Sequence, residues 1–180
     1  MKLLLQDLKF SQTENVEQHI WKLTFYNVIE LLRKGQSEET NSEVKEVHKK
    51  TLIAVIEDGI KFFENLLTVL QDNYHFSIEE LTGSSATMLS QLPNKFSPYT
   101  NLAIISAQKV CLFMGDLARY KEQANDTTNF NKAKQWYTKA QMLNPKNGRP
   151  YNQLAILAIY AVSCRNLLTT QIYLTNKTLS

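Results

Sequence analysis

The sequence contains few of the residues that interrupt regular secondary structure, with 5 glycines and 4 prolines among 180 residues. Glycine and proline are the poorest helix formers, so the long segments that lack them favour an all-helical chain. Cysteine is also scarce, and Cys111 and Cys164 form no CxxC or other metal-ligand spacing. Such cysteines are typical of a reducing compartment rather than of a disulfide framework. We therefore expect a cytoplasmic and nuclear protein in which Cys111 is a small core residue.

Patterns that would indicate catalysis are missing as well. The histidines His19, His48 and His75 are scattered along the chain, and no glycine-rich phosphate loop is present. Serine, histidine and acidic residues do not cluster as they do in hydrolases. The sequence therefore predicts a protein that is not an enzyme and that uses no cofactor and no metal.

Neither a signal peptide nor a membrane partner is expected from the hydropathy pattern. The first apolar run, Leu3–Leu5, is broken by Gln6 and Asp7 and is too short for a signal peptide. No stretch approaches the ~20 apolar residues of a membrane span. The net charge of +3 is mildly basic and does not by itself indicate a nucleic-acid partner.

Apolar residues recur at spacings of three and four, which predicts amphipathic helices packed side by side. Gly35 is expected to end the first long helix, because glycine tolerates the left-handed conformation that follows a last turn. Pro150 suits the first turn of the last helix. Residues 75–97 are predicted to form a long connection with a short turn at Ile78–Leu81. The expected helices cover residues 14–34, 42–73, 99–123, 131–143 and 151–161, preceded by a helix fragment within 1–10.

A helical-repeat pattern occupies the second half of the chain. Ala133, Tyr137, Ala140 and Pro145 have the spacing of the second helix of a tetratricopeptide repeat, and Gly115 would be the small residue of its partner helix. Small residues let two helices approach closely, and the aromatic ring fills the remaining gap. This register needs a polar loop insertion, which residues 124–129 supply. The aromatic residues expected to pack in this region are Trp136, Tyr137 and Tyr151.

Two blocks in the same region, GDLARY at 115–120 and PKNGRPYNQLA at 145–155, are required by no general packing rule. Through them the segment Gly115–Tyr160 resembles the EST/SMG family of telomerase-binding and nonsense-mediated mRNA decay factors, most closely its EST-one-A (SMG-six) type. Residues 16–32 resemble the family more loosely, and the resemblance fades from Ala161 onward.

This resemblance implies an all-α fold, a 14-3-3-like antiparallel helical array with tetratricopeptide-type hairpins. It places a truncated helical domain at residues 1–160 and a divergent tail at residues 161–180. We therefore expect the chain to be a fragment or an alternative product of a larger family member.

Arg119 is the first candidate for a binding residue, because it is a cation on an otherwise apolar, central helix. It follows Asp116 by three positions, so both side chains lie on one helical face. From the residues alone, Arg119 either forms a structural ion pair with Asp116 or Glu122, or binds a phosphate through two parallel hydrogen bonds. The resemblance implies the phosphate role, since an Arg-Tyr pair on this helix clamps phosphoserine in 14-3-3-like domains, and Arg119 with Tyr120 matches that pair.

Three more residues complete the expected phosphopeptide site. Related domains with a good pocket carry a lysine in a W-x-x-x-F-K pattern, but here Tyr26 stands at the lysine position. Lys22 lies one turn earlier on roughly the same face and is a candidate to supply the charge. Asn152 looks like the asparagine that holds the peptide backbone in 14-3-3 proteins, although such a residue can equally be capped at a helix start.

Three functions stay open on this basis. The resemblance favours a non-catalytic phosphopeptide-binding module whose partner is a phosphorylated RNA helicase of the decay pathway. The second function is a phosphorylation-independent scaffold that forms a heterodimer with another family member or contacts the telomerase complex. The third is a nucleic-acid binder for telomeric or messenger RNA, which would use the basic repeat surface of Lys132, Lys134, Lys139, Lys146 and Arg149. The EST-one-A type cleaves RNA with a separate PIN nuclease domain, so the expected role here is recruitment.

Overall fold

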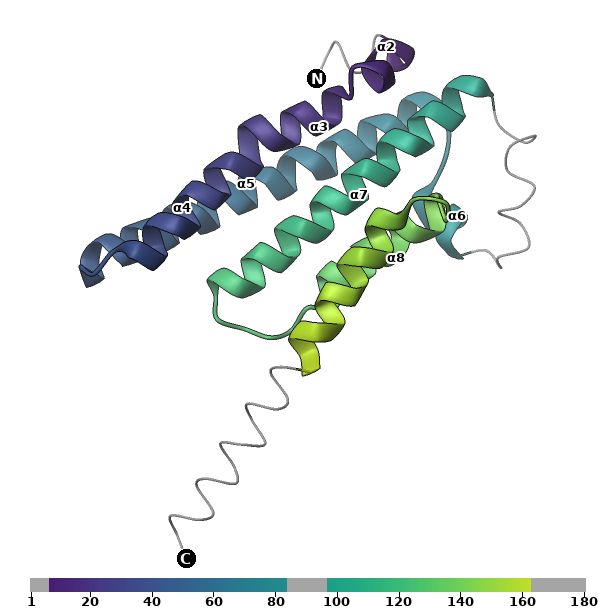
Figure 1. The fold of residues 1–180 in the computed structure, drawn as a ribbon. Coiled ribbons are helices and arrows are strands. Elements are labelled where there is room, and N and C mark those ends of the chain that lie inside the picture. The colour runs from purple at the N-terminus through teal and green to yellow at the C-terminus, as the bar shows by residue number, and fades with distance from the viewer. Residues whose placement is uncertain (1–6, 84–96, 163–180) are drawn as a thin grey trace, which may run out of the picture.

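The computed structural model describes residues 7–83 and 97–162, and every regular element within them is a helix (Figure 1). The all-α expectation is therefore confirmed, and each of the five long helices predicted from the apolar spacing is present. The elements are α2 (Leu8–Thr13), α3 (Val16–Ile20), the π-helical turn η1 (Trp21–Tyr26), α4 (Asn27–Glu38), α5 (Ser42–Tyr74), α6 (Ile78–Gly83), α7 (Pro98–Ala124), α8 (Asn131–Leu143) and a last helix over residues 148–162.

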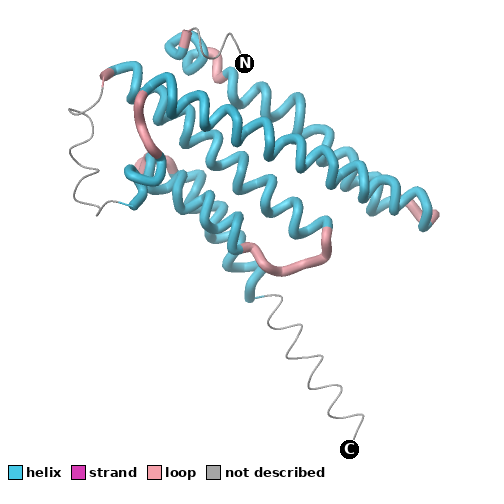
Figure 2. The backbone as a smooth tube through the Cα atoms, turned by 180° about the vertical axis from the view of Figure 1, so that it is seen from behind, coloured by secondary structure: helices cyan, strands magenta, loops and turns pink. Residues whose placement is uncertain are grey.

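The helix α7 is the centre of the molecule. It lies between the layer of α3, α4 and α5 on one side and α8 on the other, as the ribbon of Figure 1 and the backbone tube of Figure 2 show. The side chain of Ser97 caps its first turn by accepting a hydrogen bond from the backbone of Thr100 at 3.1 Å. Ala103, Ala107, Val110, Cys111 and Phe113 have no exposed surface, so this helix carries much of the core. Cys111 is thus the small core residue expected from the sequence.

The apolar character of α7 also bears on the membrane expectation. By length and composition alone α7 could cross a membrane, which the sequence analysis did not anticipate for any stretch. However, 67% of its most apolar window is buried inside the protein. A helix that other helices cover on several sides shows this composition because it forms the core.

The N-terminal helix differs from the uniform helix predicted for residues 14–34. Asn15 adopts a left-handed conformation with φ 49° and separates α2 from α3. The chain then passes through the wider turn η1, which brings Trp21 and Phe25 together onto the core side. The Trp21 ring stacks on Phe113 with ring centres 5.1 Å apart, and the Phe25 ring lies 5.4 Å from that of Phe63. These aromatic contacts explain why the helix widens at this point.

The prediction that Gly35 ends the first long helix is wrong. The helix α4 continues to Glu38, and Gly35 has no positive φ. A Cβ atom at Gly35 would lie 3.1 Å from the ring of His48 on α5. This glycine therefore allows two antiparallel helices to approach closely rather than terminating one of them. The following helix begins at Ser42, as expected, with Asn41 as its capping residue.

The predicted connection at residues 75–97 is partly described. The short helix α6 covers the expected turn at Ile78–Leu81, and His75 ends α5 in the left-handed conformation. Residues 84–96 of this connection lie outside the described part of the chain, as does the tail at 163–180.

The repeat hairpin forms as the alanine pattern predicts. Ala133, Tyr137 and Ala140 are fully buried between α8 and its neighbours, and α8 ends at Leu143, two residues before Pro145. A Cβ atom built on Gly115 would lie 2.3 Å from the ring of Tyr137, so only glycine fits there. This contact is the close approach of α7 and α8 that the repeat spacing indicates.

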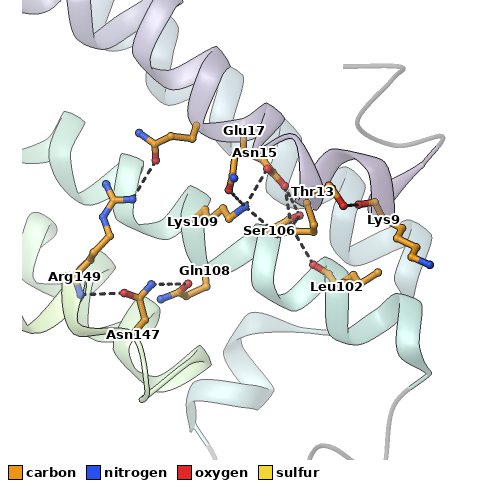
Figure 3. A network of polar contacts seen from close by, with 12 residues as sticks. Lys9, Thr13, Asn15, Glu17, Leu102, Ser106, Gln108, Lys109, Asn147 and Arg149 are labelled. Carbon is orange, nitrogen blue, oxygen red and sulfur yellow. Dashed lines mark hydrogen bonds and ion pairs between the residues drawn. The ribbon is translucent and has the colours of Figure 1, made fainter.

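A polar network holds the N-terminal helices against α7 (Figure 3). The Glu17 carboxylate has no exposed surface, and it accepts hydrogen bonds from Ser106 at 2.5 Å and Gln12 at 3.1 Å. Lys109 compensates its charge at 3.4 Å and also donates to Gln12 at 2.9 Å and to Asn15 at 3.2 Å. The buried charge is therefore both paired and hydrogen-bonded, which such burial requires.

The PKNGR part of the second sequence block joins this network from the repeat side. The side chain of Asn147 donates to Gln108 on α7 at 3.1 Å and accepts from the backbone N–H of Arg149 at 3.0 Å. Arg149 in turn donates to Gln18 on α3 at 3.1 Å (Figure 3). Three segments far apart in sequence thus meet here. Their contacts explain why Asn147 and Arg149 occur in the PKNGR segment.

Candidate anion-binding site

Arg119 lies near the C-terminal end of α7, in contact with α8. Its Nη2 donates to Asp116 Oδ1 at 3.0 Å, and its Nε donates to the Tyr137 hydroxyl at 3.4 Å. The Tyr137 hydroxyl in turn donates to the same Asp116 oxygen at 2.7 Å. The side chains of Arg119 and Asp116 are 12% and 15% exposed, so the ion pair expected from the sequence exists at the edge of the core. Glu122, the alternative partner, instead accepts a hydrogen bond from Thr127.

A second arginine reaches the same place from another helix. Arg33 on α4 lies with its guanidinium carbon 4.9 Å from the centre of the Tyr120 ring, and that of Arg119 lies 4.5 Å from the same centre. Glu30 accepts from Arg33 at 2.8 Å and from the Tyr120 hydroxyl at 3.1 Å. We call Arg33, Arg119 and Tyr120, with the carboxylates Asp116 and Glu30, the arginine–tyrosine site.

The ionisation of this site follows from its burial and its charges. Burial acts to lower the pKa of Arg119, but its interactions with Tyr137 and Asp116 outweigh burial and raise it. Burial is also the main cause that raises the pKa of Tyr120 to about 12, and it raises the pKa of Tyr137 still further. At neutral pH the site therefore offers cationic guanidinium donors and neutral hydroxyl groups.

The two guanidinium groups retain unused donors. Each arginine side chain has five N–H bonds. The Nε and Nη2 atoms of Arg119 donate to Tyr137 and Asp116, and the Nη1 atom of Arg33 donates to Glu30. The two carboxylates hold the guanidinium groups in place, and a guanidinium group with free donors is the kind of group that binds a phosphate.

The structure places the predicted site residues unevenly. Arg119 and Tyr120 lie together, as the resemblance implies. Lys22 and Tyr26 are exposed on η1, where the Tyr26 ring lies 6.3 Å from that of Trp21, and Asn152 is exposed on the last helix. Within the described ranges, no hydrogen bond or ion pair joins these three residues to the arginine–tyrosine site. Their part in binding stays a prediction.

Arg33 is the site residue that the sequence analysis missed. It lies seven positions after Tyr26, which is two helical turns, so it shares a face with the position where the resemblance implies a lysine. That spacing was visible in the sequence. The spacing alone does not indicate a binding residue, because an arginine near the end of an amphipathic helix is usually solvated.

The histidines are dispersed, and two aromatic residues of the repeat, Trp136 and Tyr151, contact groups outside the arginine–tyrosine site. His19 and His75 are exposed, and His48 packs against Gly35. Tyr151 donates to the backbone of Pro145 at 3.1 Å, and Lys139 lies 4.9 Å from the centre of the Trp136 ring. Within residues 7–83 and 97–162, no group of three or more His, Cys, Asp or Glu side chains is arranged to hold a metal ion.

The helical array and its repeat hairpin have the arrangement of a 14-3-3-like protein-interaction module. The family model described as telomerase activating protein Est1 matches residues 15–125, and the model described as Est1 DNA/RNA binding domain matches residues 133–175. The chain therefore belongs to the Est1 family. The second match extends past Tyr160, and the expected divergence of residues 161–180 stays a prediction.

Relatives in other organisms agree with this assignment. The chain is 42% identical to telomerase-binding protein EST1A of Danio rerio over 88% of its own length and 10% of that protein. It is 30% identical to nonsense-mediated mRNA decay factor SMG7 of Danio rerio, over 87% of the chain and 13% of that protein. The human decay factor SMG5 is 24% identical over 79% of the chain and 14% of its own length. The chain thus spans a small part of each relative.

Proposed function

We propose that the chain is a non-catalytic module that binds phosphorylated peptides through the arginine–tyrosine site. The observation that carries this proposal is the convergence of Arg33 and Arg119, from two different helices, on the single ring of Tyr120. Two guanidinium forks held by carboxylates can make parallel hydrogen bonds to phosphate oxygens. The Tyr120 hydroxyl lies beside them, stays uncharged at neutral pH and donates to Glu30, the carboxylate that also binds Arg33.

The partner that we propose is a phosphorylated RNA helicase of the nonsense-mediated mRNA decay pathway. Support comes from the relatives SMG7 and SMG5, which are named as decay factors. The name of EST1A as a telomerase-binding protein supports a second setting, the telomerase complex. Both settings agree with the cytoplasmic and nuclear location expected from the cysteine pattern. The module would recruit its partner rather than act on it.

The test is a titration of the chain with a phosphoserine-glutamine peptide and its unphosphorylated twin, followed by fluorescence anisotropy. A charge-assisted hydrogen bond contributes roughly 1.5–3 kcal/mol, so the phosphorylated peptide should bind at least about tenfold more tightly. Equal affinity of the two peptides would overturn the proposal and support a scaffold that ignores phosphorylation.

Variants then assign the phosphate to the site. Arg33→Gln and Arg119→Gln should each remove most of the preference for phosphate, whereas Arg149→Gln, in the first turn of the last helix, should not. Glutamine is preferable to glutamate at Arg119, because a new carboxylate beside Asp116 would add repulsion to the loss of the fork. Circular dichroism and thermal unfolding check that each variant stays folded.

Nucleic-acid binding is a second candidate, since the family model that matches residues 133–175 is described as a DNA/RNA binding domain. Lys132, Lys134 and Lys146 are exposed in this region and make it basic. Binding of single-stranded RNA should then weaken steeply with salt. An affinity for RNA that is measurable and independent of Arg33 and Arg119 would place this activity on a different surface from the phosphopeptide site.

A further inference from the structure

A groove of about 940 Å³ lies directly beside the arginine–tyrosine site. Its walls come from α4, from the first part of α5 and from the end of α7 with the turn that follows. Arg33 and Glu30 belong both to the groove and to the site, so the two are continuous. A ligand held by its phosphate at the site therefore has this groove as a path for its adjoining chain.

The charges in the groove are not balanced. Arg33 is paired with Glu30 at 2.8 Å, and Asp126, which lines the far wall, is paired with Lys49 at 3.2 Å. Lys45 also lines the groove, and within residues 7–83 and 97–162 no carboxylate forms an ion pair with it. Lys34, which lines the groove as well, is paired with Glu38 at 3.7 Å. Among the described residues, Lys45 is therefore the lining cation that forms no ion pair, and an acidic side chain of a ligand would complement it.

The remaining polar groups suit a polypeptide backbone. Asn27, Gln36 and Gln123 line the groove, and a side-chain amide carries both a donor and an acceptor. The Oε1 atom of Gln123 is buried and has no hydrogen-bond donor among the described residues. Leaving such an acceptor unsatisfied costs free energy, and a backbone N–H in the groove would supply the missing donor.

From these contacts we infer that the groove holds the segment next to the phosphorylated serine and selects a segment that carries an acidic residue. Lys45 forms an ion pair with the acidic side chain, and the Gln123 side chain accepts a hydrogen bond from the backbone of the peptide. This inference rests on the proposed function, because the phosphate at Arg33 and Arg119 fixes where the segment enters the groove. It adds a specificity that the phosphate itself does not provide.

The experiment compares two phosphoserine peptides that are identical except for their flanks, one carrying Glu residues on both sides of the phosphoserine and the other Gln at the same positions. An exposed ion pair contributes ~0.2–1 kcal/mol, so the acidic peptide should bind about 1.4- to fivefold more tightly at low salt. In Lys45→Ala this difference should disappear while the preference for phosphate remains. Lys50→Ala is the matched control, since Lys50 lies on the same helix, pairs with Glu46 and does not line the groove.

The outcomes separate this inference from the proposed function. Binding that depends on phosphate but not on the flanks overturns the inference and leaves the proposed function intact. If the Glu-flanked peptide still binds more tightly than the Gln-flanked peptide in Lys45→Ala, the inference is also overturned, because another residue would then bind the acidic side chain. Binding that ignores the phosphate overturns both. In Gln123→Leu both phosphopeptides should bind less tightly by the same factor, and unchanged affinities would contradict the backbone contact.

Discussion

The hydroxyl group of Tyr137 offers a direct test of how the repeat hairpin supports the arginine–tyrosine site. Tyr137→Phe keeps the fully buried ring that fills the space at Gly115. It removes only the hydroxyl, which donates to Asp116 at 2.7 Å and accepts from Arg119 Nε at 3.4 Å. Asp116 would then accept from Arg119 but no longer from the Tyr137 hydroxyl. The Nε atom of Arg119 would lose its hydrogen-bond acceptor, so the guanidinium group would be held less firmly.

The magnitude follows from these two contacts. A hydrogen bond to a charged group contributes ~1.5–3 kcal/mol. Asp116 and Arg119 retain 15% and 12% exposure and their mutual ion pair, so water and that pair recover part of the loss. We therefore expect a loss of unfolding free energy of about 1–2 kcal/mol. We expect phosphopeptide affinity to fall about three- to tenfold, because a guanidinium that is held less firmly must be ordered on binding.

Thermal or urea unfolding measures the first quantity, and fluorescence anisotropy with the phosphoserine peptide measures the second. Tyr151→Phe is the matched control, since Tyr151 lies exposed on the last helix and, among the described residues, its hydroxyl donates to the backbone of Pro145. If Tyr137→Phe matches the wild type in both measurements, the hydroxyl is dispensable and Tyr137 serves packing alone. Reduced stability with unchanged affinity would refute the link between the hairpin and the site.

Three other predictions follow from the contacts described above. Tyr26→Lys should tighten phosphopeptide binding, by up to about tenfold, if a lysine there reaches the site; unchanged affinity would show that η1 directs this position elsewhere. Lys109→Met leaves the buried Glu17 carboxylate without its cation and should lower stability by about 3 kcal/mol, or Tm by roughly 6–12 °C, whereas Lys121→Met, in an exposed pair, should change Tm little. Burial raises the pKa of Cys111 to about 12, so the unfolded thiol loses its proton first and stability should fall as pH rises above about 9; Cys111→Ala should reduce that slope, and an unchanged slope would contradict the assignment.

The sequence was sufficient for most of the fold because its signals are local. The helix bounds expected from apolar spacing start at residues 42 and 99, and the observed helices start at Ser42 and Pro98, after the capping residues Asn41 and Ser97. Gly35 was misjudged because its role is tertiary. A glycine that ends a helix and a glycine that admits a neighbouring ring look alike in sequence, and only the position of His48 distinguishes them.

The site could be predicted only in part for the same reason. Arg119 and Tyr120 are adjacent in sequence and belong to a recognisable block, so the sequence alone is enough to propose both of them. Arg33 comes from a different helix, and its contact with the Tyr120 ring depends on the register in which α4 packs against α7. The π-helical turn η1, with its buried rings Trp21 and Phe25, directly precedes α4, and nothing in the periodicity of the sequence reveals such a turn.

The residues of the block GDLARY both pack the repeat hairpin and hold Arg119 in place. Gly115 admits the Tyr137 ring, Asp116 binds both the Tyr137 hydroxyl and Arg119, and Leu117 is buried in the core. Packing of the repeat hairpin and orientation of the guanidinium therefore depend on the same few atoms. A substitution such as Gly115→Ala, chosen only to disturb helix packing, would displace the Tyr137 ring and with it the carboxylate that holds Arg119. Stability and the anion binding that we propose would thus be coupled through the interface of α7 and α8.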